Sequence, residues 1–326
     1  MTNMKHPTEQ IPARKTSWLL PLLSVALAMA LVLASCVPVD TPRPEAPEYV
    51  VDDLGRLVAI EATPQRIVSL APANTEVLFA LGLGERIVGV TEFCDYPPEA
   101  LDKETVGGFY PPDIEKIIAL QPDLILAGDI HRHDVIPALE ERGFTVFALA
   151  PQTLDEILGS IEAVGTITGQ EQEASALVGS MQSKLDEVQG LTAELEERPR
   201  VLYVTWHEPL WTVGRNTWID DLIAAAGGEN IFSPYFESGA MVEIEWAIVL
   251  DPEVIITCTG HGEAKDWPFE WARTHPLLED TEARKNNRIY QVDADFVSRY
   301  GPRLIDALEW FAYFIHPEIF EEPEGH

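Results

Sequence analysis

Short apolar runs alternate with segments of helical periodicity along most of this chain. In the first half, three β-rich runs are expected to form strands: Ile67–Leu70, Ile87–Val90 and Leu124–Ala127. Asn74 and Thr75 could cap a helix after the first run, and a second helix is expected from near Asp113 to the residue before Pro122. This alternation predicts a parallel sheet covered by helices, with ligand-binding loops at the carboxyl ends of the strands.

The second half repeats the alternation after a long linking segment. A helix is expected over 155–168, and residues 171–197 contain no proline and are rich in Glu, Ala, Leu and Gln. A continuous helix there would span roughly 40 Å. The later strands and helices are expected at 200–205, 218–226, 253–258, 288–292 and 302–315. The fold class is therefore α/β, with two Rossmann-like lobes at 61–152 and 199–326 joined by a long backbone helix within 153–198.

The two halves also share a spacing. Glu115 stands seven residues before Pro122, and Glu245 stands seven residues before Pro252. An acidic residue and an apolar run follow each proline, and the offset between the halves is 130 residues. A repeated helix–proline–strand unit indicates two pseudo-equivalent lobes, each with its own parallel sheet.

The N-terminal segment is typical of a targeting signal. Three basic residues precede an apolar run at residues 18–33, and the sequence Leu-Ala-Ser-Cys ending at Cys36 resembles a lipobox, in which the cysteine is lipidated. Residues 1–35 are therefore expected to be a lipoprotein signal peptide, and residues 36–60 a tether and lead-in strand. The alternative is an uncleaved transmembrane anchor, since the run is about long enough to span a bilayer. Either hypothesis places the rest of the chain outside the cytoplasm, at a membrane.

Composition and motifs restrict the possible binding partners and the kinds of reaction the chain could catalyse. The 326 residues include 54 acidic and only 22 basic side chains, which argues against nucleic acid as a partner. This acidity is explained by solubility, by life in a salty or acidic medium, or by attraction to a basic partner surface or a cationic ligand. Cys94 and Cys258 are expected to be free thiols, with a disulfide between them as the alternative. The chain contains no P-loop, GxSxG, HExxH or CxxC motif, so an enzyme is not expected.

Three motifs resemble one family. The sequences SLAPANTE, CDYPPEA and EKIIALQPDLILA are similar to those of the cobalamin-binding proteins of ABC importers, over residues 60–317. That class of two-lobed receptors also carries ferric siderophores and haem. The resemblance implies a monomeric, lipid-anchored, extracytoplasmic receptor with no intrinsic cofactor. It would capture cobalamin or a related corrinoid between its lobes and deliver it to a permease dimer driven by a cytoplasmic ATPase.

The resemblance also implies site residues. Phe93 and Phe109 match aromatic positions that touch the ligand in the family, and Asp295 matches a position that hydrogen-bonds its rim. Four further aromatic residues on loops facing the expected cleft complete the hypothesis: Tyr110, Trp206, Trp211 and Phe296. Glu115 and Glu245 match the glutamates that dock on the permease. Their alternative role is that of ordinary first-turn carboxylates that favour the helix dipole.

Histidines leave a rival hypothesis open. His131, His133, His207 and His261 all follow expected strands and would suit zinc or manganese. A single imidazole, His207 or His131, could instead ligate the iron of haem or the cobalt of cobalamin. Anionic siderophores are less favoured, because the cleft loops contain only three scattered arginines: Arg132, Arg215 and Arg299.

Overall fold

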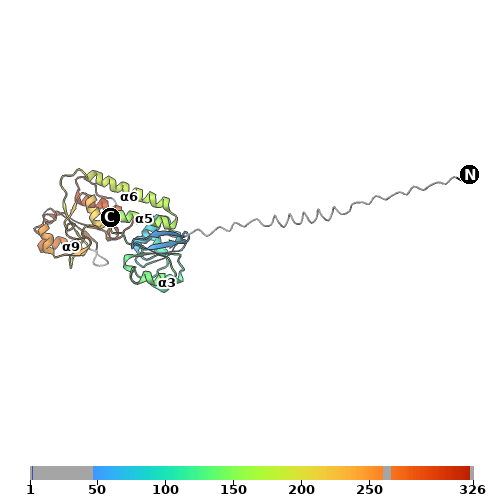
Figure 1. The fold of residues 1–326 in the computed structure, drawn as a ribbon. Helices are drawn as coiled ribbons and strands as arrows, with labels where there is room; N and C mark the ends of the chain where they lie inside the picture. Colours follow the sequence, from blue (N-terminus) through green and yellow to red (C-terminus); the bar gives the residue numbers. More distant parts are fainter. Residues whose placement is uncertain (1, 3–46, 260–265, 324–326) are drawn as a thin grey trace. The chain divides into compact units, whose positions relative to one another are not determined.

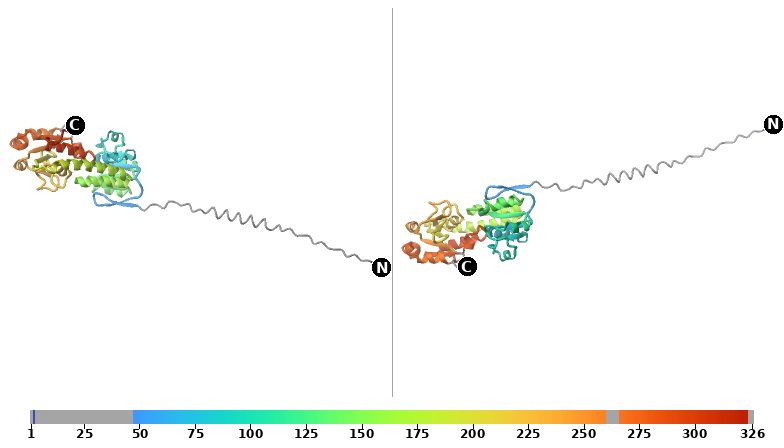
Figure 2. Two further views of the ribbon diagram at one scale, coloured as in Figure 1. Left: turned by 90° about the horizontal axis from the view of Figure 1, so that it is seen from above. Right: turned by 90° about the horizontal axis from the view of Figure 1, so that it is seen from below.

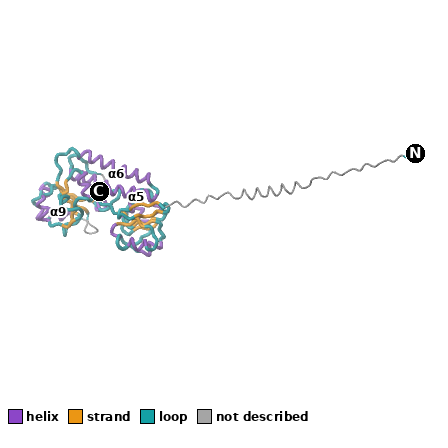
Figure 3. Tube along the Cα trace, in the orientation of Figure 1, coloured by secondary structure: helices purple, strands orange, loops and turns teal. Residues whose placement is uncertain are grey.

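The computed structural model describes residue 2 and residues 47–259 and 266–323, and it contains two four-stranded parallel sheets (Figure 1). The first sheet has the order β4-β3-β5-β6, and its strands are Ile87–Val90, Ile67–Ser69, Leu124–Gly128 and Val146–Leu149. The second has the matching order β9-β7-β11-β12, with strands Glu229–Asn230, Arg200–Val204, Val254–Cys258 and Ile289–Val292. The expected α/β fold with parallel sheets is confirmed, and Figure 3 shows the strands in two groups surrounded by helices.

Helices surround both sheets. Those that follow the first sheet's strands are α2 (Pro72–Ala80), α3 (Ile114–Ala119) and α4 (Val135–Glu140). Those of the second half are α7 (Trp218–Ala225), α8 (Ile244–Leu250), α9 (Trp267–Thr274), α10 (Glu282–Lys285), α11 (Ala294–Val297) and α12 (Leu304–Ile315). All residues of β5 and β11 are buried, as expected for parallel strands covered on both faces.

Two short antiparallel pairs complete the described strands. β1 (Glu48–Val51) pairs with β2 (Leu57–Ile60), so the end of the expected tether is a hairpin. β8 (Trp211–Thr212) pairs with β10 (Ala240–Met241). Cys36 lies outside the described residues, and among those described no helix is both long and apolar enough to cross a membrane.

A pair of helices links the two sheets. α5 (Leu154–Thr168) begins at Thr153, whose side chain accepts from the Glu156 N–H, and ends at Gly169 in the left-handed conformation. α6 (Glu171–Thr192) is five residues shorter than the expected 171–197 and spans about 33 Å. α5 packs against α2 and α7, and α6 packs against α5, α7 and α12 (Figures 1 and 2). The pair therefore contacts the helices of both sheets.

The structure corrects the expected start of α2. Pro72 occupies the first turn, the N-cap is Ala71, and no side chain caps the helix. Asn74 and Thr75 are fully buried instead. The Asn74 amide donates to the Ala127 carbonyl, so the prediction that these residues cap the helix was wrong.

The repeated spacing reflects a repeated structure. Residues 111–120 and 241–250 have the same order of buried and exposed positions along α3 and α8. Arg66 and Arg200, at equivalent strand starts, each donate through Nε to carbonyls at the end of the corresponding helix. The expected pseudo-equivalence of the two halves is thus visible in the contacts.

The domain boundaries at 152 and 198 stay predictions. Below, "first lobe" denotes β3 to β6 with the helices and loops between them, and "second lobe" denotes β7 to α12.

Candidate functional site

A cavity of about 730 Å³ opens where the carboxyl-end loops of the two sheets meet. From the first lobe, the side chains that define it are Glu92, Phe93, Asp95 and Phe109. From the second lobe they are Asp293, Asp295, Arg299 and Tyr300. This is the edge at which ligands of open α/β sheets bind.

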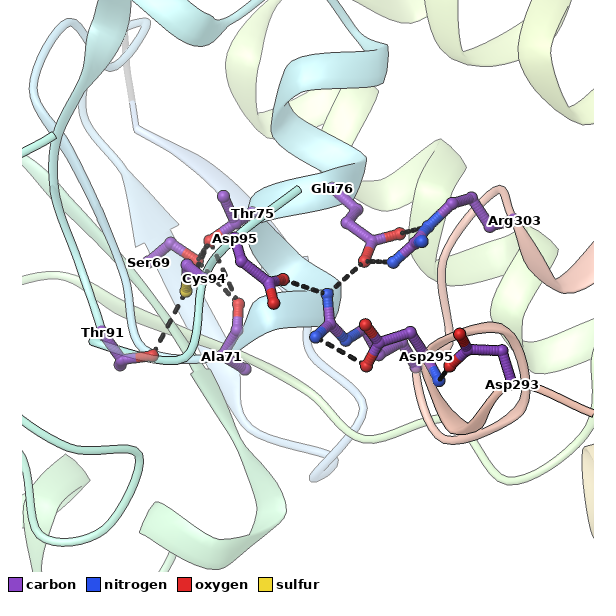
Figure 4. Close-up of polar contacts among 11 residues, drawn as sticks. Ser69, Ala71, Thr75, Glu76, Thr91, Cys94, Asp95, Asp293, Asp295 and Arg303 are labelled. Atoms are coloured by element: carbon purple, nitrogen blue, oxygen red, sulfur yellow. Dashed lines mark hydrogen bonds and ion pairs between the residues drawn. The ribbon is translucent and has the colours of Figure 1, made fainter. Parts of the chain in front are cut away.

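The loop after β4 directs Phe93 into the cavity. Cys94 turns inward, where its Sγ lies 3.1 Å from Thr75 Oγ1 and 3.2 Å from Thr91 Oγ1 (Figure 4). Burial raises the pKa of the Cys94 thiol, which therefore stays neutral. With Cys94 anchored, its neighbours Phe93 and Asp95 face outward, and Phe93 is 54 % exposed. Because the Cys94 thiol is held inward, the ring of Phe93 is exposed to a ligand in the cavity.

An ion cluster beside the cavity ties the second lobe to the first (Figure 4). The Glu76 carboxylate on α2 accepts from Arg303 Nη2 at 2.6 Å and from Arg299 Nη1 at 3.0 Å. Arg299 also contacts Asp95 of the first lobe and Asp295 of the second, both at 2.8 Å. We call these five residues the interlobe ion cluster.

Burial shapes the electrostatics of this cluster. The Glu76 side chain is 2 % exposed and that of Arg299 is 12 % exposed. Burial disfavours the charged guanidinium of Arg299, but its hydrogen bonds to Asp95 and Glu76 outweigh that effect, so its pKa is raised. Burial raises the pKa of Asp295, with Arg299 opposing the rise.

The segment around the cluster makes further contacts between the lobes. The Arg303 guanidinium lies 4.0 Å from the centre of the Tyr96 ring, within the range of a cation–π contact. Tyr300 Oη lies 3.0 Å from both the Leu149 carbonyl and Asn74 Oδ1. The turn at residues 299–303 therefore fastens the second lobe to α2 and β6.

Three of the predicted ligand-contact residues meet at the cavity: Phe93, Phe109 and Asp295. Asp295 lies in the first turn of α11, where Asp293 provides the cap, and it does not cap the last helix. Its carboxylate is therefore available to pair with Arg299.

The other four predicted contacts are not among the residues that line the cavity. Tyr110 Oη donates to the Asp134 carboxylate at 2.6 Å. Trp206 and Trp211 pair with each other across a β-bridge, and Trp211 is 42 % exposed. Phe296 packs beneath the Arg303 guanidinium, 5.3 Å away. Their contact with a ligand stays a prediction.

His131 does not present a free nitrogen. It is fully buried, its Nδ1 accepts from the Gly128 N–H at 3.0 Å, and its Nε2 lies 2.8 Å from the Phe109 carbonyl. Burial lowers the pKa of His131, which holds it neutral with Nε2 donating. Both nitrogens already have partners, which disfavours His131 as a metal ligand, and that role stays a prediction.

The other histidines are arranged differently. Within the described part of the chain, His207 Nδ1 is buried and has no hydrogen-bond partner, and burial lowers the pKa of this imidazole. Its ring lies among Trp206, Trp267 and Trp271. His133 is exposed, and His261 lies outside the described residues. Among residues 47–259 and 266–323, no group of three or more His, Cys, Asp or Glu is arranged to hold a metal ion.

The three arginines expected on the cleft loops do not all lie at the cavity. Arg132 pairs with Asp129, and Arg215 pairs with Glu237. Of the three arginines named from the sequence, Arg299 alone lines the cavity. Cys94 and Cys258 are buried free thiols, as expected.

Sequence reasoning missed Glu76, Arg303 and Tyr300. Glu76 meets its two arginines across 223 and 227 residues of sequence, so no local spacing could have indicated the pairs. The available signal was the presence of two arginines and a tyrosine within residues 299–303.

Comparison with known proteins shows which family the chain belongs to. The family model described as "Periplasmic binding protein" matches residues 67–296. The chain belongs to this family. It is 34 % identical over 313 residues to an uncharacterised ABC transporter substrate-binding lipoprotein of Bacillus subtilis, covering 91 % of this chain and 96 % of that one.

Two solved structures of this family resemble the fold described above. One is the periplasmic vitamin B12-binding protein of Vibrio cholerae, with 31 % identity, coverage of 78 % of this chain and 98 % of that one, and a TM-score of 0.67. The other is a periplasmic haem-binding protein of Roseiflexus sp., with 26 % identity, the same coverages and a TM-score of 0.68. This periplasmic binding protein is thus an ABC transporter substrate-binding protein of the class whose named members bind vitamin B12, haem or iron. The family consists of solute-binding proteins, in line with the expectation that the chain is not an enzyme.

Proposed function

We propose that this protein captures cobalamin or a related corrinoid in the cavity between its lobes and delivers it to an ABC permease. The observation that carries the proposal is the aromatic wall formed by Phe93 and Phe109, opposite the polar groups of the second lobe. A corrinoid offers a broad apolar face rimmed by amides, which suits one aromatic wall and a few hydrogen-bonding groups. The kinship with a vitamin B12-binding protein supports this choice.

Haem is the second candidate, because one relative is named for it. Haem iron in proteins needs an axial ligand such as histidine or tyrosine. The His131 nitrogens and the Tyr110 hydroxyl already have partners. His207 Nδ1 has no partner among the described residues, but His207 is not one of the residues that line the cavity. Haem propionates would also meet the carboxylates of the cavity, which disfavours an anionic ligand. Ferric siderophores of strong negative charge are disfavoured for the same reason.

The docking proposal rests on Glu115 and Glu245. Both are exposed in the first turns of α3 and α8, at equivalent positions of the two lobes. The cap of α3 is Asp113, whose side chain accepts from the N–H groups of Glu115 and Lys116, so Glu115 is not needed for that role. Two paired charges at a fixed separation would orient the receptor on a basic permease surface.

The location of the protein belongs to the proposal as well. A lipid on Cys36 would hold the receptor on the outer face of the cell membrane, and the Bacillus subtilis relative is named a lipoprotein. Beyond the permease with its ATPase, no further partner is proposed, and the receptor is expected to act as a monomer.

Calorimetric titration of the full chain in detergent with cyanocobalamin tests the function. One-to-one binding at micromolar concentration or tighter is expected. Removing a ring that the ligand buries costs about 1–3 kcal/mol, so Phe93→Ala should weaken binding by about 5- to 150-fold. Phe79→Ala, which removes a ring outside this cavity, is the matched control. No heat with cyanocobalamin, together with tight binding of haem, would reject the corrinoid and favour the second candidate.

A further inference from the structure

The charges that line the cavity are unbalanced. Four carboxylates face it, from Glu92, Asp95, Asp293 and Asp295, against one guanidinium, that of Arg299. The formal charge of this lining is therefore −3 at neutral pH. An excess of one sign in a concave site concentrates the electric field on whatever binds there.

Arg299 offers little compensation to an anionic ligand. Its Nη1 contacts both Glu76 and Asp95, and its Nη2 contacts Asp295. The side chain is 12 % exposed, so its charge is directed into the interlobe ion cluster. An anion entering the cavity would have to compete with three carboxylates for this one guanidinium.

Two of the carboxylates have no opposing charge. Neither Glu92 nor Asp293 forms an ion pair with any described residue, although Asp293 accepts from the Asp295 N–H as the cap of α11. Glu92 is exposed beside the aromatic pair Phe93 and Phe109. A positive group on the rim of a ligand stacked on these rings would supply the missing partner.

We propose that the cavity selects for a positively charged ligand and against an anionic one, through the uncompensated carboxylates of Glu92 and Asp293. This inference deepens the proposed function and rests on it, because it names the charge of the chelate that the same cavity takes. One unit charge about 8 Å from one carboxylate, at an effective dielectric constant of about 40–80, changes affinity by about two- to sixfold.

Three corrinoids that share the same cobalt ligands test the charge rule. They are cyanocobalamin, which is neutral, its peripheral monocarboxylic acid, which is an anion, and the aminoethyl amide of that acid, which is a cation. The N-acetylated aminoethyl amide controls for the added size. The full chain in detergent is titrated with each by calorimetry at about 20 mM and about 500 mM salt, where screening differs most.

The cationic form is expected to bind most tightly, the neutral form less tightly and the anionic form least. Each step in this order should change affinity by about fivefold or more at low salt. High salt should reduce the steps. Glu92→Gln should reduce each step by about two- to sixfold, whereas Glu173→Gln, an equal charge change on the exposed face of α6, should leave the steps unchanged. Equal affinities for the three forms, or tightest binding of the anion, would overturn the inference.

Failure of the proposed function gives a different result. If no corrinoid binds, the same comparison is made with a ferric trihydroxamate that carries a free ammonium group and with its N-acetylated form. Preference for the ammonium form supports the charge rule although the corrinoid proposal has failed. Equal binding of the two, or no binding of either, overturns the charge rule as well.

Discussion

Replacing Glu76 with glutamine would remove the charge that joins the two lobes while keeping the shape of the side chain. The carboxylate is 2 % exposed and accepts from both Arg299 and Arg303. Glutamine has one acceptor oxygen, and its amide nitrogen turns a donor toward a guanidinium. Two arginines would then share a largely buried site with one carboxylate fewer.

The loss of stability in Glu76→Gln depends on the partners that Arg299 and Arg303 keep. Removing one member of a buried ion pair costs about 3–5 kcal/mol when the other charge is left uncompensated. Arg299 keeps Asp95 and Asp295, and Arg303 keeps the face of Tyr96. The loss in unfolding free energy is therefore expected near the lower end of this 3–5 kcal/mol range, at about 3 kcal/mol. It corresponds to a fall in Tm of about 6–10 °C.

Urea unfolding followed by tryptophan fluorescence, together with calorimetric melting, measures this loss. Glu173→Gln on the exposed face of α6 is the matched control and should change stability by less than about 0.5 kcal/mol. A loss below about 1 kcal/mol for Glu76→Gln would show that desolvation cancels the attraction in the interlobe ion cluster, so that the cluster does not stabilise the fold.

Three further predictions concern other residues. Burial raises the pKa of Asp221 above 3.8, so the stability of the protein is highest when this carboxyl is protonated, below that pH, and falls as pH rises and the carboxyl ionises. Asp221→Asn should therefore raise Tm at pH 7, and the difference in Tm from the unchanged protein should disappear near pH 4. His131→Ala should lower stability by about 2–4 kcal/mol in urea, because two buried backbone groups lose their partner, yet leave the visible spectrum of bound aquocobalamin unchanged. Charge reversal at both Glu115 and Glu245 should leave ligand affinity intact and abolish uptake by cells; normal uptake would disprove the docking role.

The order of elements could be predicted from the sequence because it depends on local patterns. Strand β4 lies where the apolar run places it, and Asp113 and Pro122 bracket α3 as expected. The start of α2 was misplaced, because Asn74 resembles a capping residue although its amide is needed inside, at the Ala127 carbonyl. Pro72, two residues earlier, was the stronger local signal.

The site could be predicted only in part. Phe93 lies three residues after β4, so the strand pattern indicates its place at the edge of the sheet. Phe109 lies 19 residues after the end of β4, so its place at the cavity was implied by the family resemblance. The role of Arg299 could not be inferred, because its partner Glu76 is 223 residues away and pairs with it only through the packing of the lobes. His131 looked available on a loop, but the turn after β5 folds its ring back onto the Gly128 N–H.

A crystal structure of the full chain with cyanocobalamin would show whether this cavity is the corrinoid site. We expect one corrinoid between the lobes, with its apolar face against Phe93 and Phe109 and its amides near Asp295. A corrinoid bound elsewhere, or an empty cavity at saturating cyanocobalamin, would contradict this expectation.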